Sequence, residues 1–344
     1  MLSTPISTAS EPLLDVRGLK TWIPTRRGEV RAVDGIDLRV HAGEVIGLVG
    51  ESGCGKTLAA YSVLGLLPPP ARVIAGEIRF RGDDLCRRSA EERRRLRGSA
   101  MAMIFQEPLS ALNPVFPIGS QVGDILRRHS TLSARQVKVR VLELLDHVGI
   151  ASPGHVARAY PFQMSGGMRQ RVLIAMAISC SPQLLIADEP TTALDATVQA
   201  QILDLLQRLV EQAGIAMILI SHDLAVVAEM CRRVYVMYAG RIVEHSEVAA
   251  VFARPRHPYT SALLRCMPAL KQDDSPLETI EGVVPALTEP EPGCRFRPRC
   301  RYAVTLCSDQ DPAATELGGG RLAACHRATE LGLPGTPTAV GADA

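Results

Sequence analysis

The segment Gly50 to Thr57 reads GESGCGKT and could bind the phosphates of a nucleotide. It follows the apolar run EVIGLV and precedes LAAYSVLGLL, so a strand and a helix are expected on its two sides. In such a loop the backbone curls and its N–H groups point at phosphate oxygens, whereas a glycine-rich turn without a ligand is the alternative. We expect Lys56 to reach the β- and γ-phosphates and the Thr57 hydroxyl to bind Mg²⁺. The expected phosphate loop consists of Gly50, Glu51, Ser52, Gly53, Cys54, Gly55, Lys56 and Thr57.

The segment LLIADEPTTALD could place two carboxylates beside this loop. It begins as a short apolar run typical of a buried parallel strand, which would deliver Asp188 and Glu189 to the carboxyl end of that strand. Asp188 would hold Mg²⁺ through water, and Glu189 would orient and deprotonate the attacking water. A charge cluster at a strand end is the alternative interpretation.

The segment MSGGMRQR stands directly before the helical run VLIAMAISC. Ser165, Gly166 and Gly167 would therefore form a bare helix N-terminus, whose N–H groups and positive dipole suit an anion. A serine-capped helix without a ligand is the alternative.

Four of the nine cysteines crowd the C-terminal part of the chain: Cys294, Cys300, Cys307 and Cys325. In a reducing compartment such a group indicates metal binding before disulfides. Its spacings lack the pairs about two to four residues apart that zinc sites usually have. An iron–sulfur cluster, zinc or no metal all stay open, with His326 as a possible alternative ligand.

The elements around these residues predict an α/β protein. With 344 residues and 47% hydrophobic content, the chain can form one large domain and a smaller one. LLDVRGLKTWI and RAVDGIDLRV alternate like antiparallel strands, whereas QLLIAD and AMILIS are typical of parallel strands buried on both faces. ARQVKVRVLELLDHVGI has the apolar spacing of an amphipathic helix.

Bulk properties exclude some classes of protein. The chain has no run of about 18 apolar residues and no signal-peptide pattern, so we expect a soluble cytoplasmic protein. A net charge of +2 argues neither for nor against nucleic acid. CRRSAEERRRLRG predicts a solvated helix face, with attraction to anionic lipid headgroups as the minority interpretation.

Together the motifs resemble those of the ATP-binding-cassette (ABC) ATPases, and the resemblance covers about residues 12 to 265. In chain order these are the phosphate loop, FQEP at 105–108, SGGMRQR at 165–171, LLIADEP at 184–190, ALD at 193–195 and SHD at 221–223. FQEPLSALNP, YPFQMSGGMRQRVLIAMA and HPYTSALL look like the ATPase subunits of dipeptide and oligopeptide importers.

The resemblance implies the α/β fold of a P-loop NTPase of ABC type, with a RecA-like core and an antiparallel β subdomain. It implies an ABC nucleotide-binding domain over 1–268, with a helical signature subdomain at about 110–180. An acidic, proline-rich linker over 269–293 is expected to follow. Beyond it we expect a small Cys-rich C-terminal module over 294–328 and a disordered tail over 329–344.

The resemblance also implies roles for single residues. Gln106 would sense Mg²⁺ and water and link the site to the membrane subunits, and His222 would contact the γ-phosphate and hold Glu189 and the water. Asp195 would lie at the seam of a head-to-tail dimer, in which Ser165, Gly166 and Gly167 cap the partner's γ-phosphate. Met168 replaces the glutamine of many relatives, so it receives no phosphate-contact role. Trp22, or the guanidinium of Arg27, would stack on adenine.

The function that follows is an ATP-hydrolysing subunit that powers peptide import with ATP and Mg²⁺ from the cytoplasmic face of the inner or plasma membrane. Expected partners are two transmembrane permeases, a second ABC ATPase (a copy or a sibling) and, indirectly, an extracytoplasmic solute-binding protein, with no nucleic acid. Some relatives carry a [4Fe–4S] cluster on a similar cysteine pattern. Alternatives are an importer ATPase for nickel or glutathione, a non-transport ABC ATPase in DNA repair or translation, and a metal-dependent regulatory module.

Overall fold

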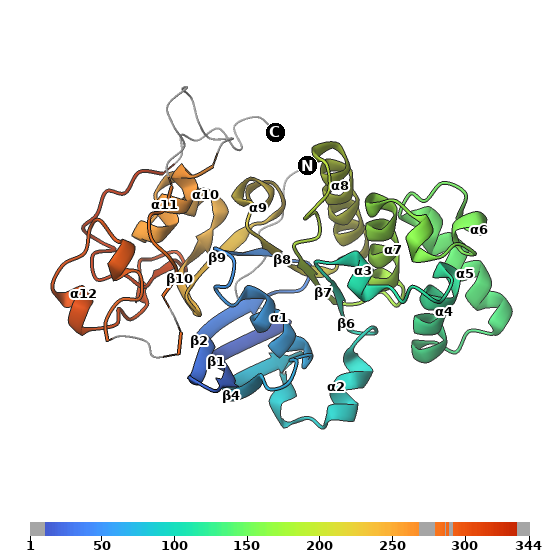
Figure 1. The fold of residues 1–344 in the computed structure, drawn as a ribbon, viewed down its shortest axis with the longest axis horizontal. Coiled ribbons are helices and arrows are strands. Elements are labelled where there is room, and N and C mark those ends of the chain that lie inside the picture. Colours follow the sequence, from blue (N-terminus) through green and yellow to red (C-terminus); the bar gives the residue numbers. More distant parts are fainter. Residues whose placement is uncertain (1–10, 268–278, 286, 289–291, 336–344) are drawn as a thin grey trace.

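Two sheets organise the protein in the computed structural model, which describes residues 11–267, 279–285, 287–288 and 292–335 (Figure 1). One sheet has the strand order β2-β1-β4-β5, and the other has the order β11-β12-β10-β9-β3-β8-β7-β6. The strands are β1 (Leu14–Thr25), β2 (Gly28–Val40), β3 (Val45–Val49), β4 (Arg72–Phe80), β5 (Asp83–Asp84), β6 (Met101–Ile104), β7 (Leu184–Asp188), β8 (Ala216–Ser221), β9 (Arg233–Tyr238), β10 (Arg241–Glu247), β11 (Thr315–Glu316) and β12 (Leu322–Ala323).

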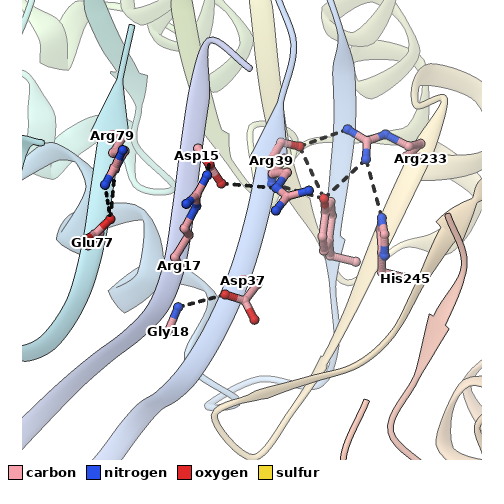
Figure 2. Close-up of polar contacts among 10 residues, drawn as sticks. Asp15, Arg17, Gly18, Asp37, Arg39, Glu77, Arg79, Arg233 and His245 are labelled. Atoms are coloured by element: carbon pink, nitrogen blue, oxygen red, sulfur yellow. Dashed lines mark hydrogen bonds and ion pairs between the residues drawn. The ribbon is translucent and has the colours of Figure 1, made fainter. Parts of the chain in front are cut away.

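The smaller sheet is antiparallel because β1 and β2 form the hairpin that their alternating pattern predicts. Their pairing runs from Leu14 opposite Val40 to Thr25 opposite Gly28. Leu14 and Val16 are buried in the core, while Asp15 between them pairs with charged side chains (Figure 2). The sheet therefore has one apolar face and one face lined by ion pairs.

The larger sheet is parallel in its middle, where β3, β7 and β8 are neighbours. Every residue of β7 and β8 is buried, as their continuous apolar runs predict. Successive residues of β7 enter different cores: Leu184 and Ile186 pack with the β1 and α1 side, and Leu185 and Ala187 pack with the helices of the other side. Burial on both faces fixes the register of these strands.

The helices lie on both sides of this sheet and at its β6 end (Figure 1). Their bounds are α1 (Lys56–Leu64), α2 (Ala90–Leu96), α3 (Pro108–Ala111), α4 (Ile118–His129), α5 (Ala134–His147), α6 (Pro153–Val156), α7 (Gly166–Ile178), α8 (Ala196–Ala213), α9 (Leu224–Met230), α10 (Val248–Ala253), α11 (Pro258–Arg265) and α12 (Leu306–Asp309). The amphipathic helix predicted from sequence is α5, which buries Val137, Val141, Leu144 and Leu145. The arginine-rich α2 buries none of its residues, which confirms its solvated face. Within the described ranges, no helix is long and apolar enough to span a bilayer.

The two sheets are joined by partly buried polar contacts between β2, β9 and β10 (Figure 2). Tyr235 of β9 accepts a hydrogen bond from the Arg39 N–H at 3.1 Å and stacks on His245 of β10 with ring centroids 4.4 Å apart. Arg233 donates two hydrogen bonds to the buried carboxylate of Glu44, at 2.6 and 2.8 Å. This network fixes the position of the small sheet over the larger one.

The cysteine-bearing tail, residues 292–335, contacts this framework at several points. Its strand β12 pairs with β10, where Leu322 lies opposite His245. Near its end, Leu333 is buried and the carbonyl of Pro334 accepts a hydrogen bond from Ser261 at 2.7 Å. Residues 336–344 and most of the expected linker lie outside the described residues. The division into a cassette, a linker and a separate module therefore stays a prediction.

Candidate nucleotide-binding and hydrolysis site

The phosphate loop lies between β3 and α1, as the sequence predicts. Gly50 and Gly55 have positive φ angles, +152° and +107°. A Cβ atom at Gly50 would lie 2.1 Å from the carbonyl oxygen of Met237, and one at Gly55 would lie 2.2 Å from that of Ala32. Only glycine fits both positions, because the backbone conformation and the space exclude other side chains.

Lys56 is the buried cation of the loop, only 5% exposed. Its Nζ donates to the carbonyl oxygens of Gly50 at 2.7 Å and Glu51 at 3.0 Å. The ammonium group is thus held inside the curve of the loop, where it can exchange carbonyl partners for phosphate oxygens.

The first expected Mg²⁺ ligands lie next to each other at the end of β7. The Thr57 hydroxyl donates to the Asp188 carboxylate at 3.3 Å, although the two residues are 131 positions apart. Asp188 is 1% exposed, and burial raises the pKa of its carboxyl group despite the hydrogen bond from Thr57. A buried acid of this kind is best ionised beside a cation, so these oxygens fit Mg²⁺ by their chemistry.

Glu189 receives three polar side chains from separate segments. Gln106 Nε2 and Thr192 Oγ1 each donate to its Oε2 at 2.9 Å, and His222 Nδ1 lies 3.4 Å from the same oxygen. The Glu189 backbone has φ +45°, and its N–H donates to the carbonyl of Ile220 at 2.9 Å. An unfavourable conformation held by neighbouring contacts is frequent at functional sites. The structure thus brings together the predicted base and its two predicted helpers.

Ser165 and Asp195 begin two helices. Ser165 Oγ accepts from the Met168 N–H at 3.3 Å at the start of α7, and Asp195 Oδ1 accepts from the Val198 N–H at 2.9 Å at the start of α8. A Cβ atom on Gly167 would lie 2.8 Å from Val198, so this glycine also permits close packing of α7 on α8. The cap roles are visible within this chain, whereas contacts of Ser165, Gly166, Gly167 and Asp195 with a partner stay predictions.

Trp22, the predicted adenine contact, lies on β1 opposite Arg72 of β4. The Arg31 guanidinium carbon is 4.8 Å from the centroid of its ring, so an arginine already covers one ring face. Arg27 is exposed in the turn between β1 and β2. The adenine contact of either residue stays a prediction.

Three residues at the loop and base were missed by the sequence analysis. Thr192 holds Glu189, and it could have been noticed because it stands inside the DEPTTALD segment. Tyr259 accepts the Glu51 N–H at 2.8 Å, and Arg299 forms a two-pronged ion pair with the Glu51 carboxylate. Nothing in the sequence signals the last two contacts, because they join residues more than 200 positions apart.

Cys294, Cys300, Cys307 and Cys325 all line one small cavity of the tail, together with His326. Burial raises the pKa of the Cys294 thiol to about 11 and raises that of Cys300 and Cys325. Among the described residues, however, no three His, Cys, Asp or Glu side chains are placed as a set of metal ligands. The four thiols have the chemistry of a Cys₄ site, and all of them line the same cavity. In this structure, however, they do not lie close enough together to form a set of metal ligands. The structure therefore does not support the iron–sulfur or zinc site that the sequence predicts, because the described residues form no set of metal ligands.

Comparison with known proteins places the chain in a family. Residues 33–192 match the family ABC transporter, and residues 243–307 match the oligopeptide/dipeptide transporter C-terminal region. A probable peptide ABC transporter ATP-binding protein of Sinorhizobium fredii is 48% identical over 93% of this chain and 96% of its own. The dipeptide transport ATP-binding protein DppD of Escherichia coli is 46% identical over 91% of this chain and 96% of its own.

Solved structures share the fold. The cassette MJ0796, in a dimeric post-hydrolysis state with ADP and Pi, aligns with a TM-score of 0.62 at 24% identity, covering 68% of this chain and 98% of its own. The cbiO1 protein of Clostridium perfringens, part of the ABC transporter complex cbiONQ, has a TM-score of 0.60 at 27% identity, covering 71% of this chain and 92% of its own. With the phosphate loop, Asp188 and the Glu189 contacts assembled beside one strand end, the chain belongs to the ATP-binding proteins of ABC transporters and is an ATPase of that family.

Proposed function

We propose that the chain is the ATP-hydrolysing subunit of an ABC importer for dipeptides or oligopeptides. The observation that carries this proposal is the meeting of Gln106, His222 and Glu189 beside the Thr57–Asp188 pair. The match of residues 243–307 to the oligopeptide/dipeptide region, and the peptide-transport names of the relatives, support the solute class.

The residues divide the work of hydrolysis between binding and proton transfer. Lys56 binds the β- and γ-phosphates, and the loop N–H groups surround them. Thr57, Asp188 and Gln106 would hold Mg²⁺, which neutralises charge on the phosphates when it is bound. Glu189 accepts the proton of the attacking water, while His222 and Gln106, which contact the same carboxylate, orient it.

A second cassette completes the site in this proposal. Ser165, Gly166 and Gly167 begin α7, whose N–H groups can receive the γ-phosphate of ATP held by a partner. Helix α7 packs with α3, α4, α5, α8 and β6, whereas α1 packs on β1, β2, β4 and β7, and the two helices lie apart in Figure 1. This separation favours a head-to-tail dimer with Asp195 at its seam, and the partner can be a copy or a sibling.

The membrane partners follow from the same proposal. Two transmembrane permeases would bind the cassettes at the cytoplasmic face of the inner or plasma membrane, so that the chain is peripheral to the bilayer. An extracytoplasmic solute-binding protein would deliver the peptide. The uptake test below distinguishes peptides from the other possible solutes, nickel and glutathione. It also distinguishes import from a non-transport role in DNA repair or translation.

The four cysteines of the tail are our candidate ligands for a [4Fe–4S] cluster, with Zn²⁺ as the alternative. The support is their shared cavity and the resemblance of the cysteine pattern to that of peptide-importer ATPases. Protein purified and reconstituted without oxygen should be brown and contain about four irons per chain if the cluster forms. Zinc would leave it colourless, and elemental analysis that finds neither metal would overturn this part of the proposal.

The importer proposal is tested by uptake in cells that lack this chain. Wild-type protein should restore uptake of a radiolabelled dipeptide, whereas Glu189→Gln should not. Glu229→Gln is a matched control because Glu229 is an exposed glutamate on α9. Restoration of nickel or glutathione uptake without peptide uptake would replace the solute class, and restoration of none would remove the importer role.

A further inference from the structure

The phosphate loop has a second set of contacts on the side that faces the tail. Glu51, the second residue of the loop, receives two hydrogen bonds from Arg299: Nη1 to Oε2 at 2.6 Å and Nη2 to Oε1 at 2.9 Å. The Arg299 side chain is 3% exposed, and the Glu51 side chain is 27% exposed. A two-pronged and largely buried pair of this kind has a fixed geometry.

Arg299 is also held in place by residues other than Glu51. It donates from Nε to the carbonyl of Glu281 at 2.9 Å and from Nη2 to that of Ile280 at 3.1 Å. Its guanidinium carbon also lies 5.8 Å from the centroid of the Tyr238 ring. The guanidinium is thus positioned before it meets Glu51, which lowers the entropic cost of the pair.

Glu51 is connected to the groups that bind phosphate. Its carbonyl oxygen accepts from Lys56 Nζ at 3.0 Å, and its N–H donates to the Tyr259 hydroxyl at 2.8 Å. Tyr259 is fully buried, and its ring lies 5.4 Å from that of Phe296, which comes from the same tail turn as Arg299. The side chain and the backbone of Glu51 are therefore both held from the tail side.

The charge of Glu51 gives this contact a consequence for ATP. A carboxylate on the phosphate loop repels a polyanionic nucleotide unless a cation neutralises it. Arg299 supplies that cation, and the pair keeps the carboxylate turned toward the tail.

We propose that Arg299 is a positioning residue for ATP binding, which acts through Glu51 by neutralising its carboxylate and holding the phosphate loop in its curled form. The inference depends on the proposed ATPase function. It gives the tail a direct role in nucleotide affinity, whether or not the cysteines hold a metal.

The test measures Mg·ATP binding and steady-state hydrolysis with the purified full-length chain. Arg299→Gln should raise the Kd and KM for ATP about tenfold, because the Glu51 carboxylate then repels the phosphates without a cation to neutralise it, while kcat at saturating ATP changes less than about twofold. Arg299→Lys keeps the cation and should fall between wild type and Arg299→Gln. Arg301→Gln is the matched control, because Arg301 is an exposed arginine two residues away.

A double variant separates the electrostatic role from simple stabilisation of the tail. Adding Glu51→Gln to Arg299→Gln removes the carboxylate that would otherwise face the nucleotide without a cation. The double variant should bind ATP more tightly than Arg299→Gln alone, although a second contact has been changed. A merely structural ion pair predicts no such recovery.

The outcomes are distinct. The inference is overturned if Arg299→Gln binds ATP as tightly as wild type, or if the double variant does not regain ATP affinity. In either case the proposed function stands as long as the wild-type chain hydrolyses ATP. A wild-type chain that neither binds nor hydrolyses ATP in the same assay overturns both.

Discussion

The two sides of the phosphate loop are lined by different kinds of residues. We call the side with Glu189 and His222 the open side, and the side with Phe296 and Arg299 the tail side. On the open side, the Glu189 carboxylate is 12% exposed and the His222 side chain next to it is 61% exposed. On the tail side, Phe296 is 3% exposed and packs edge-on to Tyr238 with ring centroids 5.2 Å apart. The open side holds polar and charged groups, of which His222 is the most exposed, whereas aromatic rings and buried ion pairs support the loop from the tail side.

The difference reflects what each side has to do. Groups on the open side must exchange partners with water, nucleotide and a second cassette, so contacts to solvent are an advantage. Groups on the tail side can keep the same partners throughout, and burial strengthens their hydrogen bonds. We therefore expect changes on the open side to alter turnover and changes on the tail side to alter stability or affinity.

The largest expected effect is on the open side. Glu189→Gln removes the proton acceptor but keeps a similar shape, so hydrolysis should fall about 10²–10⁴-fold while ATP binding persists. ATP-bound dimers should accumulate, which size-exclusion chromatography with Mg·ATP can measure. Hydrolysis at the wild-type rate would show that Glu189 is not the base, and Glu229→Gln on α9 serves as the control for loss of a glutamate charge.

On the tail side the comparison predicts a loss of stability. Phe296→Ala removes a buried ring that contacts Tyr238, Tyr259 and His257, and it should lower the free energy of unfolding by about 3–5 kcal/mol. Chemical denaturation of the full chain measures this value. Phe162→Ala is the matched control, since that ring is 67% exposed and should cost little. Equal losses in the two variants would contradict the buried character of the tail side.

A smaller effect is expected from acid, through the strand that carries the tail. His245 lies on β10 opposite Leu322 of β12, and burial together with Arg233 lowers its pKa to about 4. As the pH falls, His245 takes up a proton more readily in the unfolded chain, where its pKa has the ordinary value, than in the folded chain. Acid therefore shifts the equilibrium toward the unfolded chain. The stabilising contribution is complete above about pH 6.5 and is lost as the pH falls toward 4, by about 3 kcal/mol in total.

The variant His245→Phe tests this pH dependence. Phenylalanine keeps the stacking on Tyr235 but cannot take up a proton, so unfolding should depend less on pH between about 6.5 and 4 than in wild type. His155→Phe, at an exposed histidine of α6, should leave that dependence unchanged. An identical pH profile for His245→Phe and wild type would assign the acid sensitivity to other groups.

The open side was largely predictable from sequence, because short segments carry it. The phosphate loop, the β7 strand end and the Ser165 cap each depend on a few neighbouring residues and on local periodicity. The hairpin of β1 and β2, the parallel strands β7 and β8, and the amphipathic α5 follow from the same local patterns. Their chemistry can be inferred once a strand and a helix are placed around each motif.

The tail side was decided by tertiary structure. No local pattern pairs Glu51 with Arg299, which lie 248 positions apart, or places β12 beside β10. Burial of Phe296 and Arg299 depends on the whole surface that the cassette offers to the tail. Sequence by itself therefore determined which residues are candidates to bind the nucleotide, because phosphate chemistry requires particular residue types at short spacing. Only the folded chain decided what supports them, because many buried side chains can fill that role and long-range packing selects among them.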